Sequence, residues 1–291
     1  MASDAHYSQA VSFTAQVIDG RVVAERVRAE VREAVAGLAR PPGLATLLVG
    51  DDPASAVYVQ SKRRACVEAG MRDLHEHLPA DITQDELSAH IGALSADPRV
   101  TGILLQLPLP GHLDPLELIE LIAPDKDVDG LTQISAARLA RGVPGLRPCT
   151  PLGILELLDY YRIDVTGLDA VVVGRSQLVG WPLAQMLLQR DATVTSCHKG
   201  TRDLMSETRQ ADILVVAAGV RGLITPAHVK PGATVIDVGI HRTPDGLRGD
   251  VDADAVREVA GRLSPVPGGV GPMTIAMLLR NTVEAARLQG S

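Results

Sequence analysis

Short apolar runs alternate with amphipathic stretches along this chain, and such alternation predicts successive β-α-β units. In the first half, two mainly apolar runs are typical of buried parallel strands, at Leu44–Gly50 and Gly102–Pro110. Amphipathic periodicity predicts helices in three further stretches, at Gly20–Leu38, Ser55–Gly70 and Pro115–Ile122. These elements form a first α/β layer that ends near Pro148.

The second half repeats the pattern after a predicted helix at Leu152–Tyr161. Four short apolar runs predict strands, at Asp169–Gly174, Ala192–Cys197, Asp212–Gly219 and Ala233–Gly239. Helices are expected between them, notably at Trp181–Gln189, and a last helix is expected at Thr274–Leu288. The pattern predicts an α/β fold with two α/β domains around a cleft, the second of Rossmann type with a mostly parallel sheet. We place the first domain at residues 1–148, completed by the C-terminal helix 274–291, and the second at residues 149–273.

The composition is consistent with this fold and argues against nucleic acid as a partner. Of the 291 residues, 46% are hydrophobic and only 2% are aromatic, so Val, Leu, Ile and Ala must build the cores. With 28 basic and 35 acidic side chains, the formal net charge is −7, which disfavours nonspecific binding of nucleic acid. Any phosphate group must therefore be held by a local cluster of donors rather than by the overall charge.

Cysteine usage and hydropathy favour a cytoplasmic protein. Cys66, Cys149 and Cys197 are odd in number and widely spaced, which favours free thiols over disulfides or a zinc site. No stretch reaches the roughly 18 consecutive apolar residues of a membrane span. The first 16 residues lack the basic start and apolar run of a secretory signal, and we expect a poorly ordered extension there. We expect no metal and no membrane partner.

A candidate phosphate-binding turn follows the predicted strand at Asp169–Gly174, where the chain reads GRSQLVGWP before a helix. Backbone N–H groups at such a helix N-terminus attract a pyrophosphate. Gly174 would permit the sharp turn and Gly180 a close approach of the backbone, but Ser176 occupies the middle glycine position of the usual GxGxxG pattern. An ordinary strand-to-helix turn therefore stays open as an alternative.

The end of the next predicted strand bears on the choice of nucleotide. NAD-binding folds usually place Asp or Glu there to bind the ribose hydroxyls, whereas this strand ends in the sequence SCHK. Arg175 and Lys199, converging on one point, would suit a 2′-phosphate, which favours NADP over NAD. The alternative is that both are solvated surface charges.

Tyr58 and Lys62 are four residues apart in the predicted helix Ser55–Gly70, so they share one helix face. This helix starts at the carboxyl end of a buried strand, where open α/β sheets bind ligands. Gln106 lies inside an apolar run and needs a hydrogen-bond partner there. Spacing alone shows no function, because an exposed Tyr–Lys pair is usually inert and the backbone could satisfy the glutamine. A Tyr-x-x-x-Lys pair also occurs in short-chain dehydrogenases, but their glycine loop precedes the pair, the reverse of the order here.

A series of segments between Ile18 and Thr282 resembles the bifunctional methylenetetrahydrofolate dehydrogenase/cyclohydrolases. They occur in that family's order: IDGRVVA, VGDDPASAVYVQSKRRAC, GILLQLPLP, PDKDVDGL, PCTPLGI, VVVGRSQLVGWPLAQMLL, ATVTSCH, DILVVAAG, KPGATVIDVGI and VPGGVGPMTIAMLLRNT. The combination of PDKDVDG with PGGVGPMT makes the resemblance specific. It implies oxidation of 5,10-methylenetetrahydrofolate with NADP, followed by hydrolysis of the methenyl product to 10-formyltetrahydrofolate. It also implies a cytoplasmic homodimer that serves one-carbon metabolism and purine biosynthesis.

The resemblance further implies roles for the matched positions. Lys62 would be the catalytic lysine, Gln106 would bond to it, and Tyr58 would stack on or orient the folate. Asp129, the second acid of KDVDG, would grip the pterin, because a carboxylate accepts two parallel N–H donors. Gly269 and Pro272 would border the folate, and the NADP-binding positions would be Gly174, Arg175, Ser176, Lys199 and Ile240. Water attack on the methenyl carbon needs a group that accepts a proton near neutral pH, and we assign this step to Lys62.

Two positions depart from the family pattern, and two other functions compete with the one it implies. Lys199 stands where the family often has Ser or Thr, and His241 stands where Asn is common. A shikimate-type NADP-dependent dehydrogenase shares the broad architecture, but the DVDG and PGGVGPMT segments argue against it. A non-catalytic folate or NADP sensor would bind ligand without turnover, and such a sensor has no need of Lys62.

Overall fold

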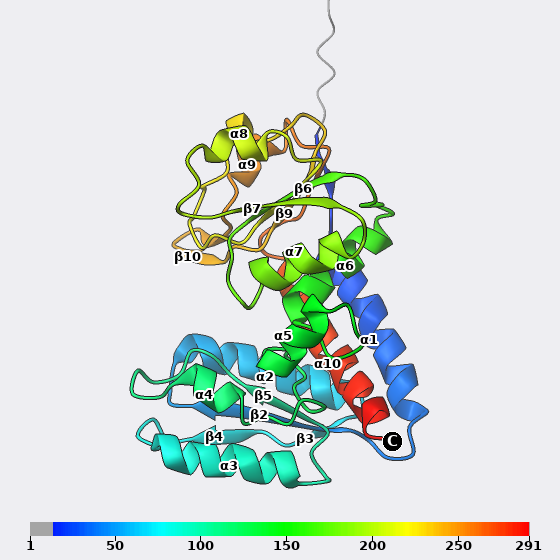
Figure 1. Cartoon of the computed structure of the whole chain (residues 1–291), viewed down its shortest axis with the longest axis vertical. Helices are drawn as coiled ribbons and strands as arrows, with labels where there is room; N and C mark the ends of the chain where they lie inside the picture. The colour runs from blue at the N-terminus through cyan, green and yellow to red at the C-terminus, as the bar shows by residue number, and fades with distance from the viewer. Residues whose placement is uncertain (1–13, 291) are drawn as a thin grey trace, which may run out of the picture.

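The structure is a computed structural model that describes residues 14–290, and it confirms the predicted α/β class. Two parallel sheets lie in separate lobes, and long helices run between the lobes along one side (Figure 1). The lower lobe in that view contains β2 to β5, and the upper lobe contains β6 to β9. The space between the lobes is therefore bounded by both halves of the chain.

The four-stranded sheet of the lower lobe is built around β2 (Gly43–Val49), every residue of which is buried. β5 (Gly102–Leu105) pairs with one edge of β2, in parallel. The short strands β3 (Arg72–Asp73) and β4 (Glu76–Leu78) pair in parallel with the other edge. A strand that is buried on both faces requires the continuous apolar run that this stretch of sequence has.

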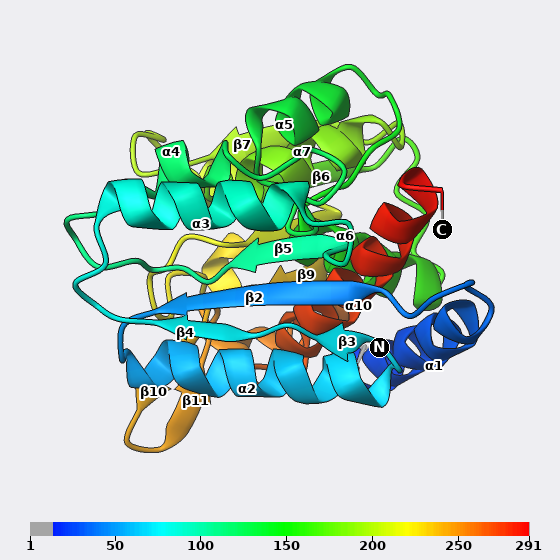
Figure 2. The ribbon, with the colours of Figure 1, turned by 90° about the horizontal axis from the view of Figure 1, so that it is seen from below.

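Two helices cover the opposite faces of this sheet, α2 (Pro53–Glu68) and α3 (Gln84–Ala96), as Figures 1 and 2 show. Side chains alternate across a strand, so Leu44 packs with the core on the α2 side. Ala45, its neighbour, packs with the apolar residues of α3. The start of α2 is fixed by Asp52, whose carboxylate accepts a hydrogen bond from the backbone N–H of Ser55 at 2.7 Å.

The six-stranded sheet of the upper lobe has the order β1-β12-β9-β8-β6-β7, with every neighbouring pair parallel. Its strands are β1 (Gln16–Val17), β6 (Asp169–Val173), β7 (Thr193–Cys197), β8 (Ile213–Val216), β9 (Thr234–Asp237) and β12 (Arg262–Leu263). The helices are α1 (Gly20–Ala36), α4 (Pro115–Ile119), α5 (Gln133–Ala140), α6 (Cys149–Tyr160), α7 (Gly180–Leu188), α8 (Leu204–Thr208), α9 (Ala253–Val256) and α10 (Val270–Leu288), with a 3₁₀ turn η1 (Pro226–His228). A small hairpin is formed by β10 (His241–Thr243) and β11 (Gly246–Arg248).

Several boundaries differ from those predicted. The strand predicted to reach Pro110 ends at Leu105, because prolines have no N–H for a sheet ladder and the chain leaves the sheet before them. The last helix begins at Val270 rather than Thr274. The predicted N-terminal extension was wrong for Gln16, which pairs with β12, while residues 1–13 lie outside the described part of the chain.

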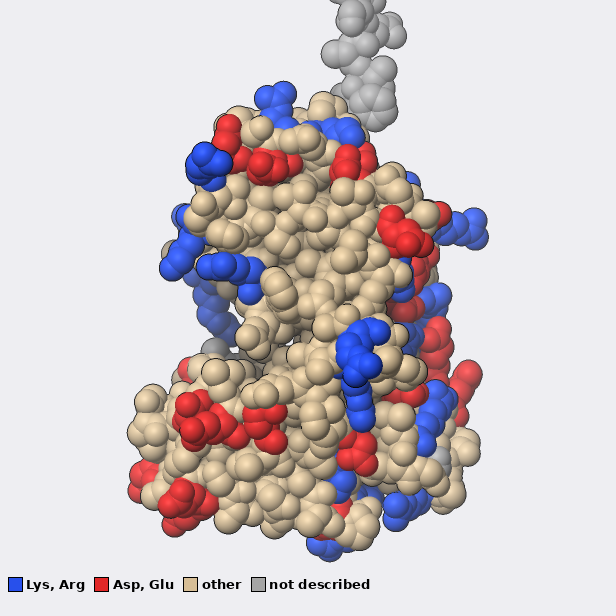
Figure 3. Space-filling model, viewed as in Figure 1, with Lys and Arg blue, Asp and Glu red and all other residues tan. Residues whose placement is uncertain are grey.

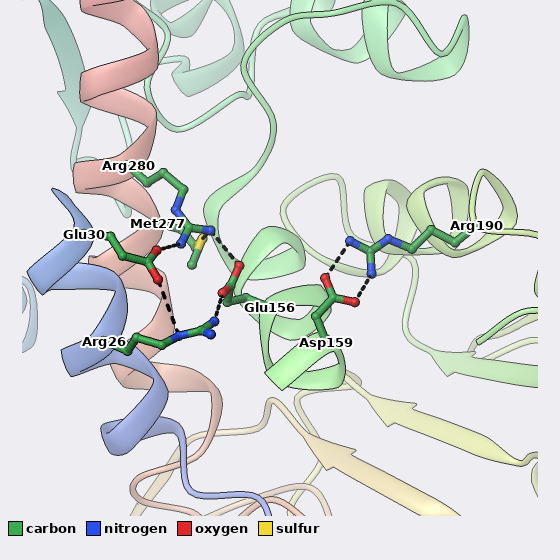
Figure 4. Close-up of polar contacts among 7 residues, drawn as sticks. All are labelled: Arg26, Glu30, Glu156, Asp159, Arg190, Met277 and Arg280. Carbon is green, nitrogen blue, oxygen red and sulfur yellow. Dashed lines mark hydrogen bonds and ion pairs between the residues drawn. The ribbon is translucent and has the colours of Figure 1, made fainter. Parts of the chain in front are cut away.

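A layer of three helices connects the lobes, in which α1 packs on α10 and both pack on α6. Four charged side chains link these helices (Figure 4). On α10, the Arg280 guanidinium lies 2.6 Å from the carboxylate of Glu156 on α6 and 2.9 Å from that of Glu30 on α1. Arg26 pairs with the same two acids. The network ties together three segments that are distant in sequence.

Two further predictions concern the cysteines and membrane-spanning helices. Cys66, Cys149 and Cys197 are all unpaired and buried, as predicted for free thiols. Among the described residues, none of the helices is long and apolar enough to cross a membrane.

Candidate active site

In both sheets the strand order reverses at a strand whose carboxyl end faces the space between the lobes. In the upper sheet, β6 lies between β8 and β7, so the connections from β6 and toward β8 leave in opposite directions. In the lower sheet, β2 lies between β4 and β5. Open α/β sheets bind ligands beyond the carboxyl ends of strands at such points. Figure 3 shows the molecular surface hollowed between the lobes on this side.

Lys62 and Gln106 meet at the carboxyl end of the lower sheet. The Nζ of Lys62, from α2, donates a hydrogen bond to Oε1 of Gln106 at 2.9 Å. Gln106 directly follows β5, and its backbone N–H donates to Leu47 of β2 at 2.9 Å, so the sheet holds it rigidly. Tyr58 lies one turn before Lys62 on α2, and 40% of it is exposed. Gln106, the polar residue inside the apolar run, thus has the side chain of Lys62 as its hydrogen-bond partner.

The first of two cavities here, which we call the lysine cavity, has a volume of about 220 Å³. Its lower wall includes Lys62, Gln106 and Asp129. Its upper wall includes Leu178 and Val179, from the loop between β6 and α7. The lysine and the candidate nucleotide loop therefore line one cavity, although they come from different lobes.

The carboxyl group of Asp129 has an unusual environment inside the lysine cavity. Burial raises the pKa of Asp129 above the ordinary value, and the nearby Lys62 ammonium opposes this shift. Asp129 also hydrogen bonds the thiol of Cys149. Burial likewise raises the pKa of Cys149 well above its ordinary value, and the neighbouring Asp129 adds to the rise. The thiol therefore stays protonated and acts as a donor, not as a nucleophile.

The second cavity, which we call the proline cavity, also has a volume of about 220 Å³. Tyr58 lines it from the lower lobe, and Ile240, Gly269 and Pro272 line it from the upper side. Ile240 lies three residues beyond the carboxyl end of β9 and is 45% exposed. Tyr58 and Lys62 lie one helical turn apart, so α2 contributes to both cavities.

The loop after β6 requires glycine at two positions. Gly174 has a φ of +119°, and a Cβ there would lie 2.1 Å from the carbonyl oxygen of Ala217. A Cβ on Gly180 would lie 2.0 Å from the carbonyl oxygen of Gly174. The turn is closed by Ser176, whose Oγ accepts from the N–H of Val179 at 3.2 Å. Only glycine at these two positions allows the backbone segments to pack this closely.

Two cations lie near this loop. Arg175 follows Gly174 directly, and Lys199 lies just beyond the carboxyl end of β7, the strand next to β6. Both side chains are exposed, and within residues 14–290 no ion pair holds either of them. Figure 3 shows Lys and Arg side chains on the upper lobe beside the hollow and acidic ones on the lower lobe. This distribution offers unpaired positive charge to an anionic group.

Several cavity residues were not singled out from the sequence. Thr150 and Thr274 both line the lysine cavity, and their hydroxyl oxygens lie 2.9 Å apart. Cys149 was treated only as a free thiol, although it bonds Asp129 inside the cavity. These residues lie in the PCTP and GPMT segments, so the signal was present in the motifs. Their mutual contact is a product of the tertiary fold.

The chain matches two family models over nearly its whole length. Residues 18–129 match the model described as tetrahydrofolate dehydrogenase/cyclohydrolase, catalytic domain. Residues 148–290 match the model described as tetrahydrofolate dehydrogenase/cyclohydrolase, NAD(P)-binding domain. Bifunctional protein FolD 2 of Frankia alni is 66% identical over 278 residues, which cover 94% of this chain and 96% of that protein.

Solved structures agree with this similarity. The bifunctional FolD enzyme of Campylobacter jejuni is 47% identical with a TM-score of 0.91, covering 94% of this chain and 99% of that one. The dehydrogenase-cyclohydrolase of Trypanosoma brucei, complexed with NADP cofactor and inhibitor, is 38% identical with a TM-score of 0.90, covering 95% of this chain and 99% of that one. A chorismate mutase/shikimate 5-dehydrogenase fusion protein from Clostridium acetobutylicum shares the fold alone, at 11% identity and a TM-score of 0.51 over 83% and 89% of the two chains.

Proposed function

The chain belongs to the tetrahydrofolate dehydrogenase/cyclohydrolase family, and we propose that a single site at the lysine and proline cavities performs both of its reactions. The protein is a bifunctional enzyme of one-carbon folate metabolism. It oxidises 5,10-methylenetetrahydrofolate to 5,10-methenyltetrahydrofolate with NADP and hydrolyses that product to 10-formyltetrahydrofolate. The shikimate-type alternative has only a distant likeness of fold behind it.

One observation carries the proposal of a shared site. Lys62 is hydrogen bonded to Gln106 at 2.9 Å, and both line a cavity whose opposite wall is the loop that follows β6. A folate held against Lys62 would therefore also face the nucleotide loop. Placing two reacting groups in one crevice supplies the orientation on which hydride transfer depends.

The folate would be held by residues from both cavities. We assign the grip on the pterin to Asp129, whose carboxylate can accept two parallel N–H bonds from an aminopyrimidinone edge. Tyr58 would stack on the ring system, since its exposed side chain lines the proline cavity. Gly269 and Pro272 would border the substrate on the opposite side.

The residues of the upper lobe fit an NADP molecule. The close packing of Gly174 on Ala217 sets the path of the loop after β6, and the backbone N–H groups at the start of α7 would bind the pyrophosphate. Ser176 would contact the phosphates, Arg175 and Lys199 would neutralise a 2′-phosphate, and Ile240 would line the nicotinamide end. NADP, when bound, supplies the acceptor for the hydride that leaves the methylene carbon.

The hydrolytic step needs proton transfers that the substrate does not provide. Water adds to the methenyl carbon, one of its protons leaves, a ring C–N bond breaks, and the departing nitrogen takes up a proton. We assign the proton transfers to Lys62, the ionisable group of the lysine cavity bonded to the neutral amide of Gln106. Gln106 would orient the Lys62 Nζ, because its own backbone is fixed to β2.

Replacing Lys62 by Met tests this assignment directly. The change keeps the length of the side chain but removes its proton-transfer group, so hydrolysis of methenyltetrahydrofolate should fall by about 10²- to 10⁴-fold. The assay follows the loss of methenyl absorbance in buffer corrected for spontaneous hydrolysis. Arg64→Met, which removes an exposed cation from the same helix, is the control and should hydrolyse normally.

The outcomes separate the competing functions. Normal hydrolysis by the Lys62→Met variant would show that the lysine is not the proton-handling group. A wild-type protein that binds NADP and folate but turns over neither would favour the sensor.

We further propose that the enzyme is a cytoplasmic homodimer that supplies one-carbon units for purine biosynthesis. This proposal is supported by the family resemblance and by the reducing compartment that three unpaired cysteines indicate. Sedimentation equilibrium of the purified protein would give a dimer mass if it is right and a monomer mass if it is not.

A further inference from the structure

Asn281 of α10 is buried, with 4% of its surface exposed, and its side chain leaves the helix to contact two other segments. Its Nδ2 donates hydrogen bonds to the carbonyl oxygens of Val128 and Arg147, each at 2.8 Å. Carbonyl oxygens only accept, so the NH₂ group of the amide must face them. One amide group thus joins α10 to two segments that lie 153 and 134 residues away in sequence.

Both carbonyls lie one residue before a residue that lines the lysine cavity. Val128 directly precedes Asp129, and Arg147 directly precedes Pro148 and Cys149, which line the cavity. The Val128 carbonyl also accepts a hydrogen bond from the thiol of Cys149 at 3.3 Å. The two segments touch closely, because a Cβ on Gly130 would lie 2.3 Å from the carbonyl carbon of Arg147.

The loop that carries Asp129 is also anchored on its other side, through the side chain of Asp127. The buried carboxylate of Asp127 accepts hydrogen bonds from the N–H of Leu131 at 3.0 Å, the N–H of Thr132 at 2.9 Å and the hydroxyl of Ser135 at 2.6 Å. These bonds fix the loop to the start of α5. Asp129 therefore lies between this anchor and the one that Asn281 provides.

We propose that Asn281 is a positioning residue that sets the placement of Asp129 in the lysine cavity and so determines the affinity for folate. The inference rests on the role proposed above for Asp129. Asn281 itself does not line the lysine cavity; it acts by holding the Val128 and Arg147 carbonyls. A carboxylate that must meet two N–H donors at once is sensitive to small displacements, since hydrogen bonds weaken steeply with misalignment.

The test replaces Asn281 by Leu, which has a similar shape and no donor. The two carbonyls lose their shared partner, and we expect the KM for the folate substrate to rise about tenfold in both the dehydrogenase and the cyclohydrolase assays. The KM for NADP should stay at the wild-type value, because the nucleotide loop is not part of this network. If the Asn281→Leu variant does not fold, Asn281→Ser, which keeps one shorter hydrogen-bond donor, provides a milder change at the same position.

Thr282→Val is the matched control, because it also removes a buried hydrogen-bond donor from α10. The Thr282 hydroxyl donates at 2.8 Å to Leu278 of the same helix and touches neither cavity segment. This variant should lose thermal stability but keep the wild-type KM for folate. An equal rise in folate KM in the Thr282 variant would overturn the inference, because general loosening would then explain both effects.

A comparison with Asp129→Ala separates this inference from the proposed function. If Asp129→Ala raises the folate KM while both Asn281 variants leave it unchanged, Asp129 grips folate and the positioning role of Asn281 is wrong. If Asp129→Ala leaves the folate KM unchanged, the proposed role of Asp129 fails, and the inference fails with it. A rise in folate KM in both variants, with unchanged NADP KM, supports both.

Discussion

Substituting Gly174 by Ala should separate the two activities of this enzyme. The new Cβ would lie 2.1 Å from the carbonyl oxygen of Ala217, whereas Cβ atoms essentially never come within 3.0 Å of another heavy atom. The loop after β6 or the loop after β8 must therefore move by about 1 Å. The φ of +119° adds strain for any residue with a Cβ, of about 1–2 kcal/mol.

The displacement should act on the dinucleotide cradle in the upper lobe and leave Lys62, Gln106 and Asp129 in place, because these residues belong to the lower wall of the lysine cavity. Loss of backbone contacts to the phosphates should raise the KM for NADP at least about tenfold, which corresponds to about 1.4 kcal/mol of binding free energy. Hydrolysis of supplied methenyltetrahydrofolate has no need of the cofactor, so its rate should change by less than about twofold. Steady-state assays of both reactions on one preparation measure this split.

Gly167 provides the matched control for backbone strain. It has a φ of +72°, but nothing lies within 4 Å of a Cβ built on it. Gly167→Ala should cost about 1 kcal/mol of stability, a fall in Tm of a few degrees, with no change in the KM for NADP. If Gly174→Ala kept the wild-type KM for NADP, the close approach between the two loops would not belong to the cofactor site.

Two further predictions concern pH and stability. Burial raises the pKa of Asp129, so this carboxyl stays protonated to higher pH than an exposed aspartate, whose pKa is about 3.9. The KM for folate should therefore rise on acidification while exposed aspartates are still ionised. The Asp129→Asn variant should lose this pH dependence. A KM for folate that stays constant down to about pH 4 would contradict the assignment. Glu156→Ala removes a carboxylate that is 16% exposed and pairs with Arg26 and Arg280. After allowance for solvent screening, the free energy of unfolding should fall by about 1–2 kcal/mol. Urea titrations at low salt measure this change. Glu25→Ala, which breaks only exposed pairs, should cost less than half as much, and equal losses would argue against a linking role for the network.

The elements that could be predicted from sequence are those with a strong local signal. β2 is buried on both faces, so its continuous apolar run predicted it within one residue at each end. The helix carrying Tyr58 and Lys62 was also predicted, because its start follows a strand and its end precedes Gly70. The two-residue strands β1 and β12 were not predicted, because they pair with each other across more than two hundred residues of sequence.

Some residues of the candidate site were likewise indicated by the sequence, whereas others are recognised only in the folded chain. The resemblance of the KDVDG and PGGVGPM segments named Asp129, Gly269 and Pro272 without any structure. The bond between Lys62 and Gln106 was implied by the family and has a distance of 2.9 Å only in the folded chain. Asn281 gave no signal in the sequence, because an asparagine inside a helix has a meaning only through the groups that its amide reaches.

By itself, the sequence determined the main strands and helices with a strong local signal, the glycines of the loop after β6 and the family to which the chain belongs. These depend on local propensities and on residue identities, which short segments contain completely. The tertiary structure alone decided that Lys62 and the loop after β6 line one cavity, and that α10 returns from the end of the chain to hold the Val128 and Arg147 carbonyls. Such contacts depend on how the two lobes pack across the helix layer, and packing is a property of the whole chain rather than of any one segment.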